Sequence, residues 1–111
     1  MVDDSSLIRE TLERYRRAYN GLDARLAHAV YPGVDLTALE RAFEDLRSQS
    51  LQFDTCSLEV RGASARATCR GSARYVPKIG SREPRAERRI WTFRLDKDDR
   101  DWKIASAWAE R

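Results

Sequence analysis

The chain has 111 residues, of which 41% are hydrophobic and 35% charged, and 21 Lys and Arg against 18 Asp and Glu give a net charge of +3. This length fits one domain with its own core. No apolar run approaches the roughly 18 residues of a membrane span, and the first 20 residues are too charged for a signal-peptide core. We therefore expect a single cytoplasmic domain that does not enter a membrane. A small basic excess without interleaved aromatic residues argues against a nucleic-acid partner.

Helical spacing of apolar residues extends to Ser48 and predicts three helices. The first begins behind Ser5 or Ser6 as the N-cap and ends at Asn20-Gly21. Its apolar face consists of Ile8, Leu12, Tyr15, Tyr19 and Leu22. A second, short helix from about Leu22 to Tyr31 stops at Pro32-Gly33. A third follows Asp35 as its N-cap, with an apolar stripe of Leu36, Leu39, Phe43 and Leu46.

From Gln49 to Glu110 apolar residues alternate with polar ones, which predicts antiparallel strands joined by turns. The first strand changes the parity of its apolar residues, so we expect a bulge near Asp54–Thr55. A two-residue hairpin at Arg61–Ser64 places Cys56 opposite Cys69, Leu58 opposite Ala67 and Val60 opposite Ala65. Small residues opposite larger ones suit a tightly curved sheet, and Gly71 is a second expected bend.

The second half of the sheet is expected to contain an open loop and a second hairpin. The loop covers Ile79–Pro84, and the next strand runs from about Arg85 to Asp96. A turn around Lys97–Arg100 would set Leu95 against Trp102, Phe93 against Ile104, Trp91 against Ser106 and Arg89 against Trp108. The last pair would lay a guanidinium over an indole. The predicted fold class is α+β, with three N-terminal helices in the concave face of a curved antiparallel sheet of four strands or more.

Four stretches of sequence carry a family resemblance. They are I-R-E-T-L-E-R-Y-R-R-A-Y-N at Ile8–Asn20, L-T-A-L-E-R-A-F at Leu36–Phe43, R-R-I-W-T-F-R-L at Arg88–Leu95 and D-W-K-I-A-S-A-W-A at Asp101–Ala109. In this order, and over nearly the full length, the chain resembles the nuclear transport factor 2-like superfamily, also called the SnoaL-like or cystatin-like cone. The first sheet hairpin common in that superfamily looks shortened or missing here.

This resemblance implies a cone-shaped domain and leaves its function open. The superfamily includes polyketide cyclases, scytalone dehydratase and ketosteroid isomerase, together with non-catalytic members such as the association domain of calcium/calmodulin-dependent kinases. Its enzymes use Asp, His or Tyr inside the cone for acid–base work, so the fold alone does not decide the function. The candidates here are Asp54 at the expected bend, His28 as the only histidine, and Tyr15 on the first helix. For each of them an ordinary structural role is favoured over catalysis.

The residues expected to line the interior of the cone would contact an apolar ligand. They are Tyr15, Tyr19, Cys56, Cys69, Tyr75, Arg89, Trp91 and Trp108. Glu87 and Arg89 continue the inward parity of Trp91 and could orient an anionic or polar ligand, although an Arg packed on Trp108 would look the same in the sequence. In a reducing compartment the two cysteines are expected as paired core thiols rather than as a disulfide, and two thiols alone make a poor metal site. We expect neither a metal nor a cofactor.

The leading hypothesis is a non-catalytic cone domain that binds an apolar small molecule, associates with itself, or both, either alone or as part of a larger protein. The predicted outer face of Ile90, Thr92, Ala105, Ala107 and Ala109 is flat and suits a homodimer formed sheet to sheet. One alternative is a cyclase, dehydratase or isomerase, in which Tyr15 or Tyr19 polarises a carbonyl and Asp54 or His28 moves a proton. Another is an engineered scaffold, which regular hairpins and paired surface charges would suit.

Overall fold

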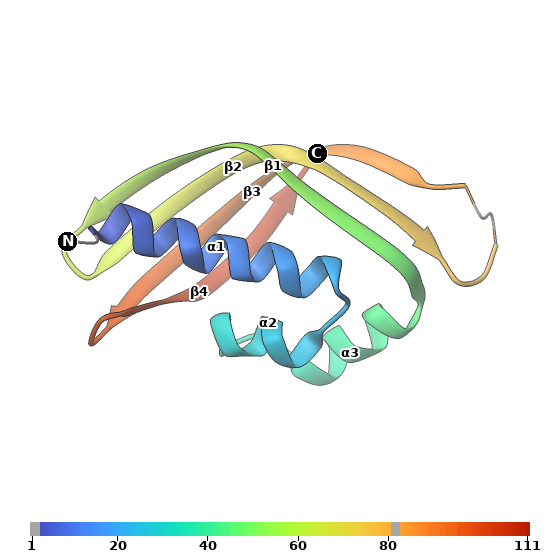
Figure 1. The fold of residues 1–111 in the computed structure, drawn as a ribbon, viewed down its shortest axis with the longest axis horizontal. Coiled ribbons are helices and arrows are strands. Elements are labelled where there is room, and N and C mark those ends of the chain that lie inside the picture. The colour runs from blue at the N-terminus through green and yellow to red at the C-terminus, as the bar shows by residue number, and fades with distance from the viewer. Residues whose placement is uncertain (1–2, 81–82) are drawn as a thin grey trace.

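The computed structural model describes residues 3–80 and 83–111, which form three helices followed by a four-stranded antiparallel sheet (Figure 1). The helices are α1 (Asp4–Asn20), α2 (Ala24–Val30) and α3 (Leu36–Glu44). The strands are β1 (Leu46–Arg61), β2 (Ser64–Pro77), β3 (Arg85–Asp98) and β4 (Asp101–Glu110), and they lie in this order in the sheet. This arrangement confirms the predicted α+β class. Of the predicted loop Ile79–Pro84, residues 81–82 lie outside the described residues.

An aspartate caps the N-terminus of each helix. The side chains of Asp3, Asp23 and Asp35 accept hydrogen bonds from backbone N–H groups three residues further on, at 2.9 to 3.0 Å. The predicted cap at Asp35 is confirmed. The predicted cap at Ser5 or Ser6 is wrong, because α1 begins at Asp4 and the backbone of Ser6 donates to Asp3. The strand pattern likewise begins earlier than predicted, since α3 ends at Glu44 and β1 starts two residues later.

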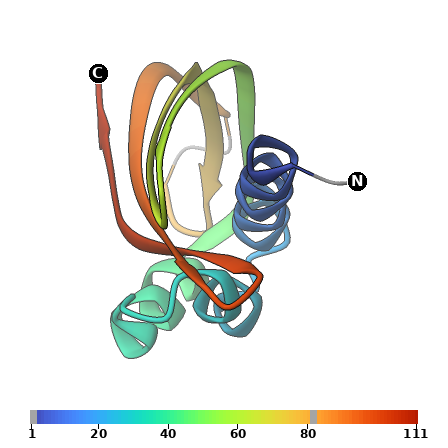
Figure 2. The same cartoon turned by 90° about the vertical axis from the view of Figure 1, so that its left-hand side faces the viewer.

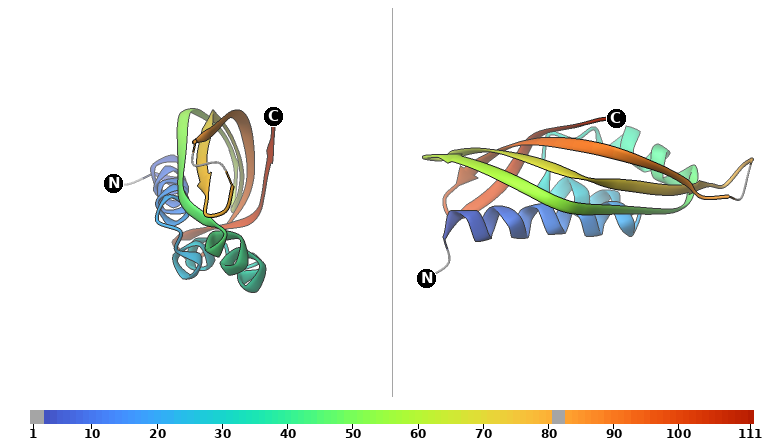
Figure 3. Two further views of the ribbon diagram at one scale, coloured as in Figure 1. Left: turned by 90° about the vertical axis from the view of Figure 1, so that its right-hand side faces the viewer. Right: turned by 90° about the horizontal axis from the view of Figure 1, so that it is seen from above.

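The sheet bends strongly, and all three helices lie on its concave side (Figures 2 and 3). Helix α1 packs against both outer strands, β1 and β4. Thr11 donates a hydrogen bond to the carbonyl oxygen of Trp102 in β4 at 2.9 Å, and Asn20 accepts one from the backbone N–H of Leu51 in β1 at 2.6 Å. Asp4 accepts from Lys97 Nζ at 2.9 Å and from Trp102 Nε1 at 3.1 Å. Helix α1 therefore bridges the two edges of the sheet, and none of the helices in residues 3–80 and 83–111 lies on the convex side.

The first hairpin has the predicted register. Cys56 lies opposite Cys69, Leu58 opposite Ala67 and Val60 opposite Ala65. The register shifts between Phe53 and Thr55, which confirms the predicted bulge, and Gly71 lies opposite Phe53 at this point. An added Cβ at Gly71 would lie 1.8 Å from the carbonyl oxygen of Gln52, so the bend requires a glycine here.

We expect Gly71→Ala to lower the free energy of unfolding by about 1–3 kcal/mol, because the new methyl group meets rigid backbone rather than a side chain that can move. Gly33→Ala is the matched control, since its Cβ would meet only Tyr31 at 3.8 Å and the Ala105 carbonyl oxygen at 4.0 Å. Urea denaturation followed by circular dichroism measures both variants. Equal stability of the two would contradict the proposed steric requirement at the bulge.

The second hairpin departs from the predicted register. Asp98 pairs with Asp101 across the turn, and Leu95 lies opposite Ile104 rather than Trp102. A register shift beyond Leu95 then places Trp108 opposite Thr92 instead of Arg89. Because cross-strand partners share one face of a sheet, Trp108 lies on the convex face.

This register also reverses the predicted alanine face. Ala107 and Ala109 lie opposite Phe93 and Trp91, whose side chains are buried on the concave side, and Ala105 lies at the register shift. The predicted outer face of three alanines is therefore wrong. Where β3 and β4 pair, the large apolar residues on the convex face are Ile90 and Trp108, and Thr92 lies directly opposite Trp108. The physical cause is one extra residue in β4, which turns every side chain beyond it to the opposite face.

Candidate functional site

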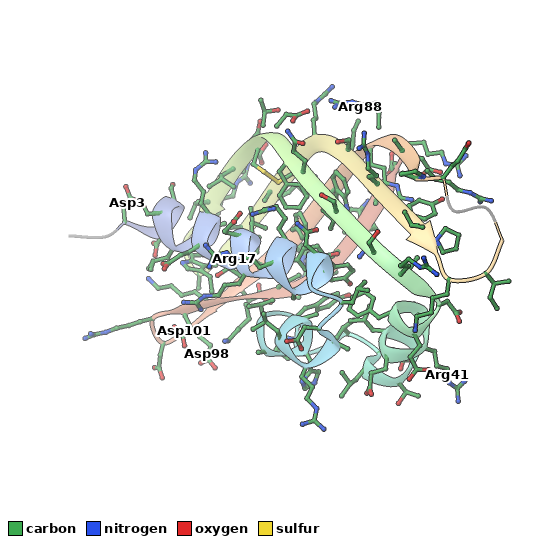
Figure 4. All side chains as sticks on the ribbon, turned by 45° about the vertical axis from the view of Figure 1, so that its right-hand side comes forward. Asp3, Arg17, Arg41, Arg88, Asp98 and Asp101 are labelled. Atoms are coloured by element: carbon green, nitrogen blue, oxygen red, sulfur yellow. A yellow bond between two sulfur atoms is a disulfide. The ribbon has the colours of Figure 1, made fainter. Side chains whose placement is uncertain are left out.

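The three candidate catalytic residues do not meet. Tyr15 lies on α1 with 5% of its surface exposed, and burial raises the pKa of its hydroxyl, so the hydroxyl stays protonated. His28 is exposed on α2. Asp54 accepts a hydrogen bond at 2.9 Å from Nη1 of Arg88, whose side chain points away from the helices (Figure 4). A catalytic role for Asp54 would need its carboxylate inside the cone, whereas this carboxylate forms an ion pair with the outward-facing Arg88.

Aromatic rings fill the centre of the cone. The Tyr15 ring lies 5.0 Å from Phe93 and 4.3 Å from Tyr19, measured between ring centroids. Phe53 extends the cluster on the sheet, at 5.0 Å from Trp91 and 6.0 Å from Phe93. Predicted interior residues Tyr15, Tyr19 and Trp91 are thus brought together as packing partners. Burial also raises the pKa of Tyr19.

The two cysteines form a disulfide between directly paired positions of β1 and β2. Their Cα atoms lie 4.0 Å apart. The prediction of paired thiols is therefore wrong about the bond, although it placed the pair correctly. Its premise was the redox compartment, which the residues themselves do not determine.

A polar network lies on the concave face, on the side of Trp91 where β2 and β3 extend past the helices (Figure 1). Glu87 accepts two hydrogen bonds from Arg89, from Nε at 3.1 Å and Nη2 at 2.8 Å. It also accepts from Tyr75 at 3.5 Å and from Arg111 at 3.3 Å. The Glu87 and Arg89 side chains are only 21% and 30% exposed. This set, Tyr75, Glu87, Arg89 and Arg111, is the mouth network.

The environment keeps the mouth network charged. The hydrogen bond from Arg89 lowers the pKa of Glu87, and the charge of Arg111 lowers it further. On β2, the residues opposite Glu87 and Arg89 are Ala73 and Gly71, so neither side chain has a large cross-strand neighbour on that strand. One carboxylate with two guanidinium groups leaves a net positive charge. Arg89 and Arg111 also line a hollow of about 210 Å³, whose other lining residues, Arg70, Arg88 and Ile90, lie on the convex face.

Sequence reasoning identified part of this site. It placed Tyr75, Arg89 and Trp91 on the inner face, and their parity is confirmed by the register. It put Trp108 in the same site, which is wrong because Trp108 lies on the convex face. Arg111 was not among the residues predicted for the site. The β4 register could have identified it, because Glu110 pairs with Ile90 and the next residue, Arg111, then lies beside Arg89.

Two further properties concern the described residues only. Within residues 3–80 and 83–111, no three His, Cys, Asp or Glu side chains come together in a way that could hold a metal ion. In the same ranges, no helix is long and apolar enough to cross a membrane.

No protein-family model and no curated protein matches the chain by sequence. Solved structures are similar over almost its whole length. A proposed dehydratase of the NTF2-like family from Streptomyces avermitilis superposes with a TM-score of 0.82 at 13% identity, covering 96% of this chain and 94% of that one. An NTF2-like superfamily protein from Salmonella enterica gives 0.80 at 15% identity, with 93% and 87% covered.

A third similar structure is a hexachlorocyclohexane dehydrochlorinase, LinA-type3, from Novosphingobium barchaimii. It superposes with a TM-score of 0.80 at 9% identity, covering 96% of this chain and 84% of that one. The chain therefore has the nuclear transport factor 2-like fold that its sequence resembles. At these identities the likeness concerns the fold alone.

Proposed function

We propose that this chain is a non-catalytic binding module that holds a small molecule, with an apolar body and an anionic group, at the mouth of the cone. The observation that carries the proposal is the mouth network, in which Glu87 orients Arg89 and Arg111 beside the aromatic pair of Phe53 and Trp91. The arginines supply charged donors for a carboxylate, and Phe53, which is half-buried, supplies an apolar wall. The sequence predicted an apolar ligand, and the arginines of the mouth network add the expectation that this ligand carries a negatively charged group.

The network suits binding better than proton transfer. A general base needs a free lone pair and a pKa near the working pH, whereas Glu87 accepts from three residues and has a lowered pKa. Tyr15 is locked among aromatic rings, and His28 and Asp54 lie elsewhere. A cyclase, dehydratase or isomerase is the alternative function, and the similar structures named as a proposed dehydratase and a dehydrochlorinase are the reason to keep it. It would require an acid–base pair that these residues do not form.

The proposal is tested with 2-naphthoate, an aromatic carboxylate, by isothermal titration calorimetry. We expect saturable binding that Arg89→Gln weakens about tenfold or more, because the variant removes a charge-assisted hydrogen bond. Neutral 2-naphthylmethanol should bind more weakly than 2-naphthoate to the unaltered chain. Arg14→Gln is the matched control, since Arg14 is exposed on α1. Equal affinity of the Arg89→Gln and Arg14→Gln variants for 2-naphthoate would refute the site.

Self-association and compartment remain predictions. The homodimer stays a prediction, and it can no longer rest on an alanine face because Ala107 and Ala109 lie opposite the inward-facing Phe93 and Trp91. The cytoplasmic setting predicted from the sequence would favour reduction of the Cys56–Cys69 disulfide, whereas an oxidising compartment would preserve it. Alkylation of the chain directly in cells, followed by mass measurement, reports which state exists there.

A further inference from the structure

The middle of the convex face is a strip of arginine and hydroxyl side chains. On β2 the outward residues from 66 to 74 read Arg, Thr, Arg, Ser, Arg, and on β3 those from 86 to 94 read Ala, Arg, Ile, Thr, Arg. These ten positions hold five arginines and no carboxylate. We call them the convex strip. At about 3.3 Å per residue, the strip is about 26 Å long.

The arginines of the convex strip are largely unneutralised. Arg66 and Arg94 are direct cross-strand partners, so two like charges lie opposite each other, which costs stability. Within the part of the chain that the structure describes, Arg88 is the one strip arginine with an ion pair, to Asp54. Among the other carboxylates, Glu59 lies on β1 directly opposite Arg66, Asp96 lies at one end of the strip, and Glu110 lies on β4 opposite Ile90. A hollow of about 380 Å³ over one end is lined by Glu59, Arg61, Ser64, Ala65, Arg66 and Arg94.

An exposed indole stands beside this strip. Trp108 lies directly opposite Thr92 and is 43% exposed, whereas Trp91 and Trp102 are each 3% exposed. No helix covers the convex side in the described residues, and Figure 4 shows Arg88 pointing away from the helices. Sequence reasoning placed Trp108 inside the cone and found no aromatic residue among the basic ones. The register of β4 brings the two together.

We infer that the convex strip binds single-stranded nucleic acid, with its arginine and hydroxyl groups on the phosphates and a base stacked on Trp108. Arginine, serine and threonine are ordinary phosphate donors, and an aromatic ring beside a basic groove is the usual platform for a splayed base. An acidic polypeptide would use the arginines but not the indole face. A second copy of the chain is disfavoured, because a symmetric sheet-to-sheet contact would bring two arginine strips face to face.

The test uses a (dT)15 oligonucleotide, with tryptophan fluorescence as the readout, because the exposed Trp108 is the indole that a base can reach. We expect saturable quenching, and an affinity that falls as salt rises with a slope of about −0.7 per phosphate contacted. The double variant Arg66→Gln/Arg94→Gln should weaken binding at least tenfold. Trp108→Ala should weaken it about tenfold when the oligonucleotide carries a fluorescein label and binding is followed by anisotropy.

The matched control is Arg25→Gln/Arg41→Gln, which removes the same charge from exposed helix positions and should leave the affinity within twofold of the unaltered chain. Circular dichroism checks that every variant is folded. The inference fails if (dT)15 causes no saturable quenching, or if the helix and strip variants lose affinity equally. It also fails if poly-glutamate competes as well as unlabelled (dT)15 while Trp108→Ala binds normally, since the surface would then recognise acidic polypeptide. The 2-naphthoate experiment concerns Arg89 on the other face, so either result can fail alone.

Discussion

Replacing Phe93 with alanine is expected to lower the free energy of unfolding by about 3–5 kcal/mol. Phe93 is fully buried in the middle of β3, and its ring contacts Tyr15 of α1 at 5.0 Å and Phe53 of β1 at 6.0 Å between centroids. The substitution therefore opens a cavity where the helix layer meets the sheet. Such a loss is a large share of the about 5–15 kcal/mol that stabilises a typical domain.

Urea denaturation, followed by both circular dichroism and fluorescence, measures this loss. Thr92→Ala is the control, because it lies next to Phe93 on the same strand but faces the convex side. If Phe93→Ala does not fold, Phe93→Leu leaves a smaller cavity and should fall between the two. A loss below about 1 kcal/mol for Phe93→Ala would mean that the aromatic cluster does not hold α1 on the sheet.

Local patterns in the sequence were sufficient for several features of the first half of the fold. Asp35, the Asn20-Gly21 stop and the Arg61–Ser64 turn act over a few residues, and the structure confirms each of them. The bulge at Asp54 was also predictable, because the apolar parity changes there and only one face of β1 is buried. Gly71 opposite the bulge fits the same explanation, since a side chain would collide with Gln52.

The register of β4 could not be predicted in the same way. The stretch from Ala105 to Ala109 alternates small residues with Ser106 and Trp108, so either face could have been the buried one. The choice is made by Trp102 and Ile104, which are 3% and 1% exposed, and by the bulge that follows them. The burial of Trp102 and Ile104 and the position of this bulge depend on packing against α1 and not on the local sequence. One residue of shift then moved Trp108 out of the predicted site and removed the alanine face.

The candidate site was predictable only in its residue types. Arg89, Trp91 and Tyr75 have the correct inward parity, but the partners of Arg89 are Glu87 within its own strand and not the indole of Trp108. The ion pairs of Glu87 depend on side-chain rotamers and on the position of Arg111. The spacing of residues in the sequence predicts neither of these. The mouth network and the convex strip therefore became visible only when the register was known.

Reduction of the Cys56–Cys69 disulfide is expected to lower the free energy of unfolding by about 3 kcal/mol. The bond joins residues 13 apart in sequence, and its main effect is to restrict the unfolded chain, since the paired strands hold the two cysteines together in the folded state anyway. For a domain of this size each kcal/mol corresponds to about 4–8 °C in melting temperature. A large fall in the melting temperature should therefore accompany treatment with tris(2-carboxyethyl)phosphine.

The matched control is the double variant Cys56→Ala/Cys69→Ala, whose melting temperature should resemble that of the reduced chain and should not respond to the reductant. Differential scanning calorimetry of four samples, each chain with and without reductant, separates loss of the bond from side effects of the reagent. Identical melting of the oxidised and reduced chain would show that the bond adds no stability. The buried state of Cys69, which is 0% exposed, adds a kinetic expectation. Because the reductant can attack either sulfur and Cys56 is only partly buried, reduction should start at Cys56 in the native state and should accelerate in urea, when opening of the β1–β2 hairpin also exposes Cys69.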